Sequence, residues 1–135
     1  MMPTEPTGQL LVFGDSHSVI WGGTDVGTKQ QYRHVQDVKT FHLGPAFGFN
    51  LLDRDTDQPG KWGTQVLTLI DEEQARGTVI SGILLAFGEI DARTQVIRRA
   101  IQSGTSIETS AAVIARRICS FAAQLQRRVA APVPI

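Results

Sequence analysis

Three short apolar runs, each followed by a glycine, constrain the fold of this chain more than any other feature. They are Leu10–Phe13 before Gly14, Phe41–Leu43 before Gly44, and Leu84–Phe87 before Gly88. A strand that is covered on both faces reads as a continuous apolar run, and such strands are typical of parallel sheets in α/β proteins. The runs therefore predict parallel strands whose carboxyl ends turn at glycines.

Strands and helices are expected to alternate along the whole chain. We expect strands at about 9–13, 38–43 and 79–87, and a fourth that begins near Val133. Helical patterns predict a crossover helix over 64–76, one or two turns over 95–101, and a long final helix. This alternation predicts an α/β fold of the flavodoxin-like, three-layer α/β/α type, with a parallel sheet and helices on both faces. With 135 residues, of which 41% are hydrophobic, one domain over 1–135 is expected.

The final helix has the most regular apolar pattern. Apolar residues recur there at steps of four and three, at Ile107, Ala111, Ile114, Ile118, Phe121 and Leu125. This spacing predicts one buried stripe, and Thr105 with Glu108 three residues later predicts a capping box at the start of the helix. The arginines at 116, 117, 127 and 128 are expected on a solvated face, and Cys119 is expected to pack beside the core.

Composition excludes several classes of function. Thirteen basic and thirteen acidic side chains cancel, so neither nucleic acid nor an anionic membrane is expected as a partner. Neither a secretory signal nor a membrane-spanning run is recognisable, which favours a cytoplasmic location. The single cysteine, Cys119, permits no internal disulfide and no thiolate metal cluster. The loop from Asp53 to Gly60 fails the calcium-loop pattern and is expected to be a plain surface loop. Neither a metal nor a cofactor is expected.

The turn after the first strand, Gly14-Asp15-Ser16, is the strongest functional signal. Reacting groups in open α/β sheets gather at the carboxyl ends of the strands, so Ser16 is expected at that edge of the sheet. A serine hydroxyl becomes an effective nucleophile when a base removes its proton and preplaced donors meet the oxyanion. Ser16, a donor such as the Gly44 N–H, and a base would form the minimum set.

In this order, Gly14-Asp15-Ser16, Gly44 and the segment 88–91 resemble the motifs of the SGNH (GDSL-type) hydrolases, which cleave acyl esters, often acetyl groups on carbohydrates. The resemblance implies that Ser16 is the nucleophile and that the backbone N–H groups of Ser16 and Gly44 form the oxyanion hole. The third family motif, Gly-x-Asn-Asp, has Ile90 in place of the asparagine, and Ile90 cannot donate a hydrogen bond.

The last family motif, an Asp-x-x-His that carries the general base, has no match in the sequence. A structural role is favoured for each of His17, His34 and His42, and His17 is adjacent to Ser16, so that the two side chains point apart. The chain is therefore expected to correspond to the N-terminal part of such a domain, incomplete at its C-terminus and inactive by itself.

Four further residues are candidates for support of the site: Asp15, Gly88, Asp91 and Arg93. The two aspartates could bind a cation, orient Arg93 or accept N–H groups from loop backbone, and the last role is favoured. Arg93 either replaces the missing asparagine as a donor or pairs with a nearby acid, and pairing is favoured.

The sequence is consistent with three functions. The chain is a serine ester hydrolase acting on a small-molecule or carbohydrate ester, or a non-catalytic relative that binds a saccharide or a protein, or an unrelated flavodoxin-like binding or signalling domain. The first two require Ser16, Gly44 and Gly88 to converge on one edge of the sheet. The sequence does not identify the acyl group, the alcohol or the oligomeric state.

Overall fold

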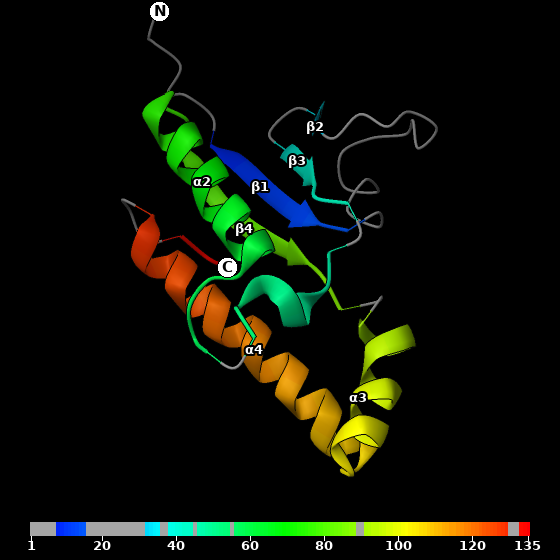
Figure 1. Cartoon of the computed structure of the whole chain (residues 1–135). Helices are drawn as coiled ribbons and strands as arrows, with labels where there is room; N and C mark the ends of the chain where they lie inside the picture. The colour runs from blue at the N-terminus through cyan, green and yellow to red at the C-terminus, as the bar shows by residue number, and fades with distance from the viewer. Residues whose placement is uncertain are drawn as a thin grey trace, which may run out of the picture.

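The computed structural model of the chain describes residues 8–15, 38–44, 46–54, 56–88, 91–129 and 133–135, and the backbone of 32–35. Its described strands form one sheet in the order β2-β3-β1-β4 (Figure 1). The strands are β1 (Gln9–Gly14), β2 (Tyr32–Val35), β3 (Val38–His42) and β4 (Ile80–Ala86). β1 pairs in parallel with both β3 and β4, whereas β2 pairs antiparallel with β3.

The three predicted parallel strands are confirmed, and so is the α/β fold class. The first of them lies between the second and the third, which is consistent with part of a flavodoxin-like sheet. β2 was not predicted, because residues 30–34 read as a polar stretch. It pairs on one side only within the described sheet, and such an outer strand needs no continuous apolar run.

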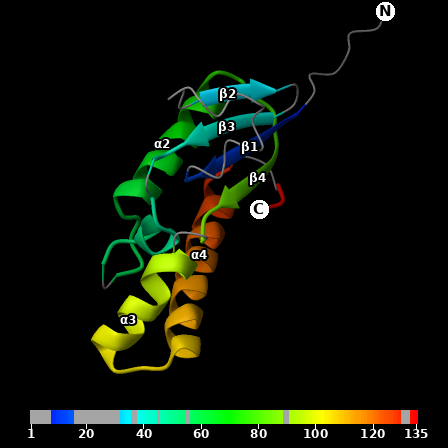
Figure 2. The same ribbon diagram turned by 90° about the vertical axis from the view of Figure 1, so that its right-hand side faces the viewer.

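The described helices are α2 (Lys61–Ala75), α3 (Val96–Ser103) and α4 (Ile107–Arg128), with single turns η2 (Gly48–Leu51) and η3 (Asp91–Gln95). The predicted crossover helix is α2, which begins three residues earlier than expected. α2 and α4 cover the same face of the sheet, while α3 packs on α4 beyond the ends of the strand arrows (Figures 1 and 2).

The hydrophobic core lies between the sheet and the helices α2 and α4. It contains residues from three strands, η2, α2 and α4: Leu11, Phe13, Phe41, Ile83, Leu51, Val66, Ile70, Phe121 and Leu125. The rings of Phe13 and Phe41 stack with centroids 4.9 Å apart, which joins β1 to β3 on this face. The core thus fixes β1, β3 and β4 relative to η2, whose first residues border the candidate site.

The start of α4 differs from the prediction in two ways. Its N-cap is Ser106, whose hydroxyl accepts the Thr109 N–H at 3.1 Å, so the predicted cap at Thr105 is wrong by one residue. Ile107 and Ala111 are exposed, although both belong to the predicted buried stripe. This part of α4 extends past the sheet and meets α3, where Ser110 is buried and donates to the carbonyl oxygen of Val96 at 2.7 Å.

Two further expectations about α4 are wrong. Cys119 is exposed and does not pack beside the core. Arg117 does not belong to a solvated face, since its guanidinium donates to the carbonyl oxygens of Phe49, Leu52 and Asp53 at 2.8–3.0 Å. These carbonyls lie within η2 and just after it, so Arg117 attaches η2 and the following loop to α4.

Past α4, the chain returns to the sheet beside β4. The Ile83 N–H donates to the carbonyl oxygen of Pro134 at 3.0 Å, and Val133 and Ile135 pack against the core. The segment 133–135 thus lies alongside β4, where the sequence predicts the start of a fourth strand, but these three residues form no regular strand.

A buried carboxylate lies near the amino ends of β3 and β4. Glu73 of α2 is 2% exposed and accepts hydrogen bonds from Lys39, from Arg76 at 2.9 Å and from Thr78 at 2.7 Å. Burial opposes ionisation of this carboxyl, but the hydrogen bonds from Lys39 and Thr78 and the charges of Lys39 and Arg76 outweigh it and lower the pKa of Glu73. We call these four residues the Glu73 cluster.

Candidate functional site

The carboxyl ends of β1, β3 and β4 meet at one edge of the sheet. In the register, Gly14 of β1 faces His42 of β3 on one side and Ala86 of β4 on the other. Asp15, Gly44 and Gly88 follow these three residues by one or two positions. The structure therefore brings three of the predicted site residues to a common carboxyl edge.

Two glycines turn the chain at this edge. The Leu43 N–H donates to the Gly14 carbonyl at 2.9 Å, which continues the β1–β3 pairing to the last residue before Gly44. Gly44 has a φ of 87° and Gly88 a φ of 114°, a region that L residues with side chains rarely adopt. Within the described residues, the Gly44 N–H makes no hydrogen bond.

The two aspartates are both buried, each 1% exposed. Asp15 directly follows β1. Asp91 begins η3 and accepts the N–H of Gly48 at 2.7 Å and that of Phe49 at 3.1 Å, which caps the first turn of η2. Asp91 thus has the loop-bracing arrangement favoured by the sequence, and it ties the segment after β4 to the segment after β3.

Of the remaining residues considered in the sequence, two are described by the structure and the others are not, or only in their backbone. Arg93 lies on η3 and is exposed. His42, the last residue of β3, is half-buried at the same carboxyl edge as Gly44. Ser16, the predicted nucleophile, lies outside the described residues, as do His17, Glu89 and Ile90, and the side chain of His34 is likewise not described.

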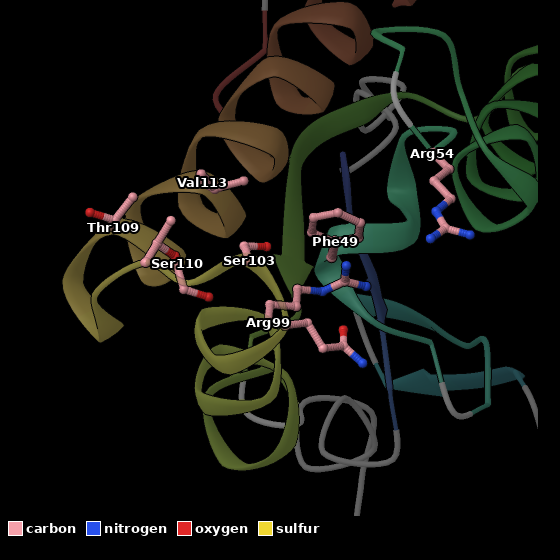
Figure 3. A pocket seen from close by; sticks show the side chains of 9 residues that line it. Phe49, Arg54, Arg99, Ser103, Thr109, Ser110 and Val113 are labelled. Carbon is pink, nitrogen blue, oxygen red and sulfur yellow. The ribbon is translucent and has the colours of Figure 1, made fainter.

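A hollow of about 430 Å³ lies beyond the carboxyl edge, between η2, α3 and the start of α4 (Figure 3). Its lining includes Phe49, Arg54, Arg99, Gln102, Ser103 and Thr109, and we call it the arginine pocket. A second hollow of about 380 Å³ shares four of its lining residues and adds Arg98. Among the described residues, no acidic side chain lines either hollow.

Phe49 organises the arginines around this pocket. The guanidinium carbon of Arg99 lies 3.4 Å from the centre of the Phe49 ring, and that of Arg117 lies 4.0 Å from it. Two guanidinium groups this close to one ring centre would collide on the same face. They therefore stack on opposite faces, and Phe49 lies between two cations.

The setting of Arg99 is electrostatically unfavourable. Burial lowers the pKa of Arg99, and the positive charges of Arg117, Arg54 and Arg98 lower it further, while the charge of Asp91 acts in the opposite direction. Within the described part of the chain, Arg99 makes no hydrogen bond or ion pair, and its Nε atom is buried without a partner. This guanidinium has unused donors in a region of excess positive charge.

Sequence reasoning did not find this pocket. The sequence gives no sign that Arg99 and Arg54 lie close together, because their proximity depends on how η2 packs against α3 and α4. The adjacent pair Arg98-Arg99 in a short helix was the one local sign, and such pairs are common on exposed helix surfaces.

The described residues contain no helix of the length and apolarity that a bilayer crossing requires. They also contain no group of three or more histidine, cysteine, aspartate and glutamate side chains arranged to hold a metal ion. Comparison of the chain with known protein families, curated proteins and solved structures gives no match.

Proposed function

We propose that this chain forms part of a serine ester hydrolase in which Ser16 is the nucleophile. The substrate would be an acyl ester of a small molecule or a carbohydrate. The observation that carries the proposal is the register of the three parallel strands, which places the residues after β1, β3 and β4 at one edge. Ser16 is separated from the buried end of β1 by Asp15 alone.

In the proposed reaction, the Ser16 hydroxyl oxygen attacks the ester carbonyl carbon while a base takes its proton. The oxyanion of the tetrahedral intermediate accepts hydrogen bonds from the backbone N–H groups of Ser16 and Gly44. The intermediate then collapses to acyl-Ser16 as the alcohol leaves with a proton. Water then attacks the acyl group, which restores the serine and releases the acid. Support for Gly44 in this role comes from its position at the carboxyl edge and from its unused N–H within the described residues.

Asp91 supports this edge indirectly. By holding the N–H groups of Gly48 and Phe49, its carboxylate fixes the segment after β4 against the segment that follows Gly44. The base and the third oxyanion donor are left unassigned. Arg93 is exposed on η3, and pairing with an acid is the role we favour for it over oxyanion binding.

A binding domain without catalysis is the second candidate. The arginine pocket favours it, since a preformed cationic hollow suits a ligand whether or not Ser16 reacts. Both candidates include the cytoplasmic location expected from the sequence, which fractionation of cells that express the tagged chain would test.

Chemical rescue tests the role of Ser16. Exogenous imidazole can supply a general base, so we expect the wild-type chain to cleave p-nitrophenyl acetate with an imidazole-dependent rate above that of Ser16→Ala. Imidazole itself cleaves this ester, and therefore the difference between the two proteins at equal imidazole concentration is the measured quantity. Ser18→Ala is the matched control and should behave as wild type.

Equal imidazole-dependent rates in wild type and Ser16→Ala would contradict the proposal. Without imidazole we expect no turnover above buffer, because an unactivated hydroxyl is close to inert toward esters at neutral pH. Turnover without imidazole that Ser16→Ala abolishes would support the nucleophile and would show that a histidine of this chain acts as the base. His42→Ala would then be the first variant to examine, because His42 ends β3 at the same edge.

A further inference from the structure

We propose that the arginine pocket binds the phosphate group of a small molecule. This inference does not depend on the reaction assigned to Ser16, because it rests on different residues. Figure 3 shows Arg99 reaching across the hollow to Phe49, with Ser103, Ser110 and Thr109 on one side and Arg54 on the other. The lining thus offers a ligand hydrogen-bond donors from Arg54, Arg99, Gln102, Ser103 and Thr109, while the Ser110 hydroxyl already donates to Val96.

The charge of the pocket favours an anion. Arg54 and Arg99 line it, and within the described chain neither guanidinium makes an ion pair or a hydrogen bond. No acidic residue contributes to the lining described for this hollow. A bound anion would offset both the cost of burying the Arg99 charge and its repulsion from the neighbouring cations, the two effects that lower the pKa of this side chain.

The donor group of Arg99 is held in place before any ligand binds. The contact with the Phe49 ring restricts the position of the guanidinium without using its N–H groups. Phe49 is itself fixed, because Asp91 accepts its N–H, and Arg117 binds its carbonyl oxygen and stacks on its other face. A preorganised donor loses little side-chain entropy on binding, which favours affinity.

Phosphate fits this pocket better than a carboxylate. Two arginines face the hollow, and a phosphate near neutral pH carries up to two negative charges, whereas a carboxylate carries one. The three terminal oxygens of a phosphate group can also accept hydrogen bonds from Gln102, Ser103 and Thr109. The volume of about 430 Å³ is in the range of small-molecule sites, and Val113 adds an apolar wall beside Phe49.

Another basic hollow, lined by Arg127 and Arg128, carries no comparable inference. Asp57 is part of its lining, and Arg128 is bound through two hydrogen bonds to Asp71 at 2.6 and 3.0 Å. Its positive charge is therefore largely compensated within the protein. The arginine pocket differs because its described lining contains no such acid.

The test is an NMR titration of the full chain at constant ionic strength, with inorganic phosphate in one arm and phenyl phosphate in the other. We expect saturable shifts of amides in 99–110, and Kd raised about tenfold or more in Arg99→Gln, because a charged hydrogen-bond partner is lost. Arg54→Gln should also raise Kd and, since Arg54 is exposed, should keep the fold. Arg116→Gln is the matched control, exposed on α4 outside the lining, and should leave Kd unchanged.

The two arms distinguish the source of the phosphate. Tighter binding of phenyl phosphate would indicate a phosphomonoester, and tighter or equal binding of inorganic phosphate would indicate the free ion. The proposal is overturned if neither compound shifts the pocket amides, if Arg99→Gln and Arg54→Gln bind as the wild type does, or if benzoate binds as tightly as phosphate.

Discussion

The Glu73 cluster and the arginine pocket are two concentrations of charge with opposite balance. In the Glu73 cluster, one buried carboxylate is surrounded by the ammonium of Lys39, the guanidinium of Arg76 and the hydroxyl of Thr78. In the arginine pocket, cations surround an aromatic ring and no acid is found among the described lining residues. The first cluster satisfies its charge inside the fold, and the second leaves donors for a ligand.

The pKa directions express the same contrast. Burial raises the pKa of Glu73, but its hydrogen bonds and cationic neighbours reverse that effect and lower it. For Arg99, burial and like charges act together, and the charge of Asp91 offsets them in part. A charge whose neighbours oppose the cost of its burial is structural, whereas a partly buried charge whose neighbours add to that cost is suited to binding a counterion.

The largest expected effect is the loss of the Glu73 carboxylate. Glu73→Gln should lower the free energy of unfolding by about 3 kcal/mol, because Lys39 is left without its partner in a mostly buried site. Urea denaturation measures this change. Glu72→Gln, an exposed neighbour on α2, is the control and should have little effect. A Glu73→Gln protein as stable as the wild type would show that the Glu73 carboxylate does not stabilise the fold.

The same carboxylate predicts a pH dependence. Because the folded state lowers the pKa of Glu73 below its ordinary value of 4.5, this group stabilises the fold above pH 4.5. That stability is lost as the pH falls through the lowered pKa. The difference in unfolding free energy between wild type and Glu73→Gln should therefore shrink on acidification, and a difference that grows in acid would contradict the assignment.

Arg117 is expected to contribute less to stability than Glu73, but its loss should affect both the attachment of η2 to α4 and the arginine pocket. Arg117→Ala should lower the free energy of unfolding by about 2 kcal/mol, since three carbonyl oxygens lose a charged donor. It should also weaken phosphate binding, because Phe49 loses one of its two supports. Arg116→Ala, the neighbouring exposed arginine, is the control for both measurements. Unchanged stability together with unchanged binding would show that Arg117 neither stabilises the fold nor supports Phe49.

The smallest expected change in stability comes from substitution of Asp91. Unlike the loss of Arg117, this substitution should not weaken phosphate binding. Asp91→Asn should lower the free energy of unfolding by about 1 kcal/mol through weaker capping of η2. It should leave phosphate affinity equal or increased, because the asparagine keeps a side-chain oxygen that can accept the Phe49 N–H while a negative charge close to Arg99 is removed. Asp57→Asn, at an exposed loop position, is the control. A marked loss of phosphate affinity in a folded Asp91→Asn protein would show that the anion argument is wrong.

The parts of the fold that the sequence predicted are those with a strong local signal. Runs such as Leu10–Phe13 identify buried parallel strands, and because parallel strands share a carboxyl edge, the common position of Asp15, Gly44 and Gly88 follows from the strands alone. The polar β2 has no such run, so its pairing with β3 was missed.

Errors and omissions arose where a side chain's partner is distant in the sequence. Arg117 was expected to be solvated because its helix is amphipathic, yet its acceptors are backbone carbonyls more than sixty residues earlier. Ile107 was expected to be buried because the periodicity continues, but the sheet ends before the helix does. The stacking of Arg99 on Phe49 leaves no pattern in either segment alone.

The central claim is that the Glu73 cluster stabilises the fold, whereas the arginine pocket binds an anion. The most direct test is to measure how the free energy of unfolding depends on phosphate concentration, at constant ionic strength, for wild type, Glu73→Gln and Arg99→Gln. Binding to the folded state at ten times Kd should stabilise the wild type by about 1.4 kcal/mol. Glu73→Gln should gain the same increment from a lower starting value, and Arg99→Gln should gain little. Equal increments in wild type and Arg99→Gln, or no increment in any of the three, would contradict the account.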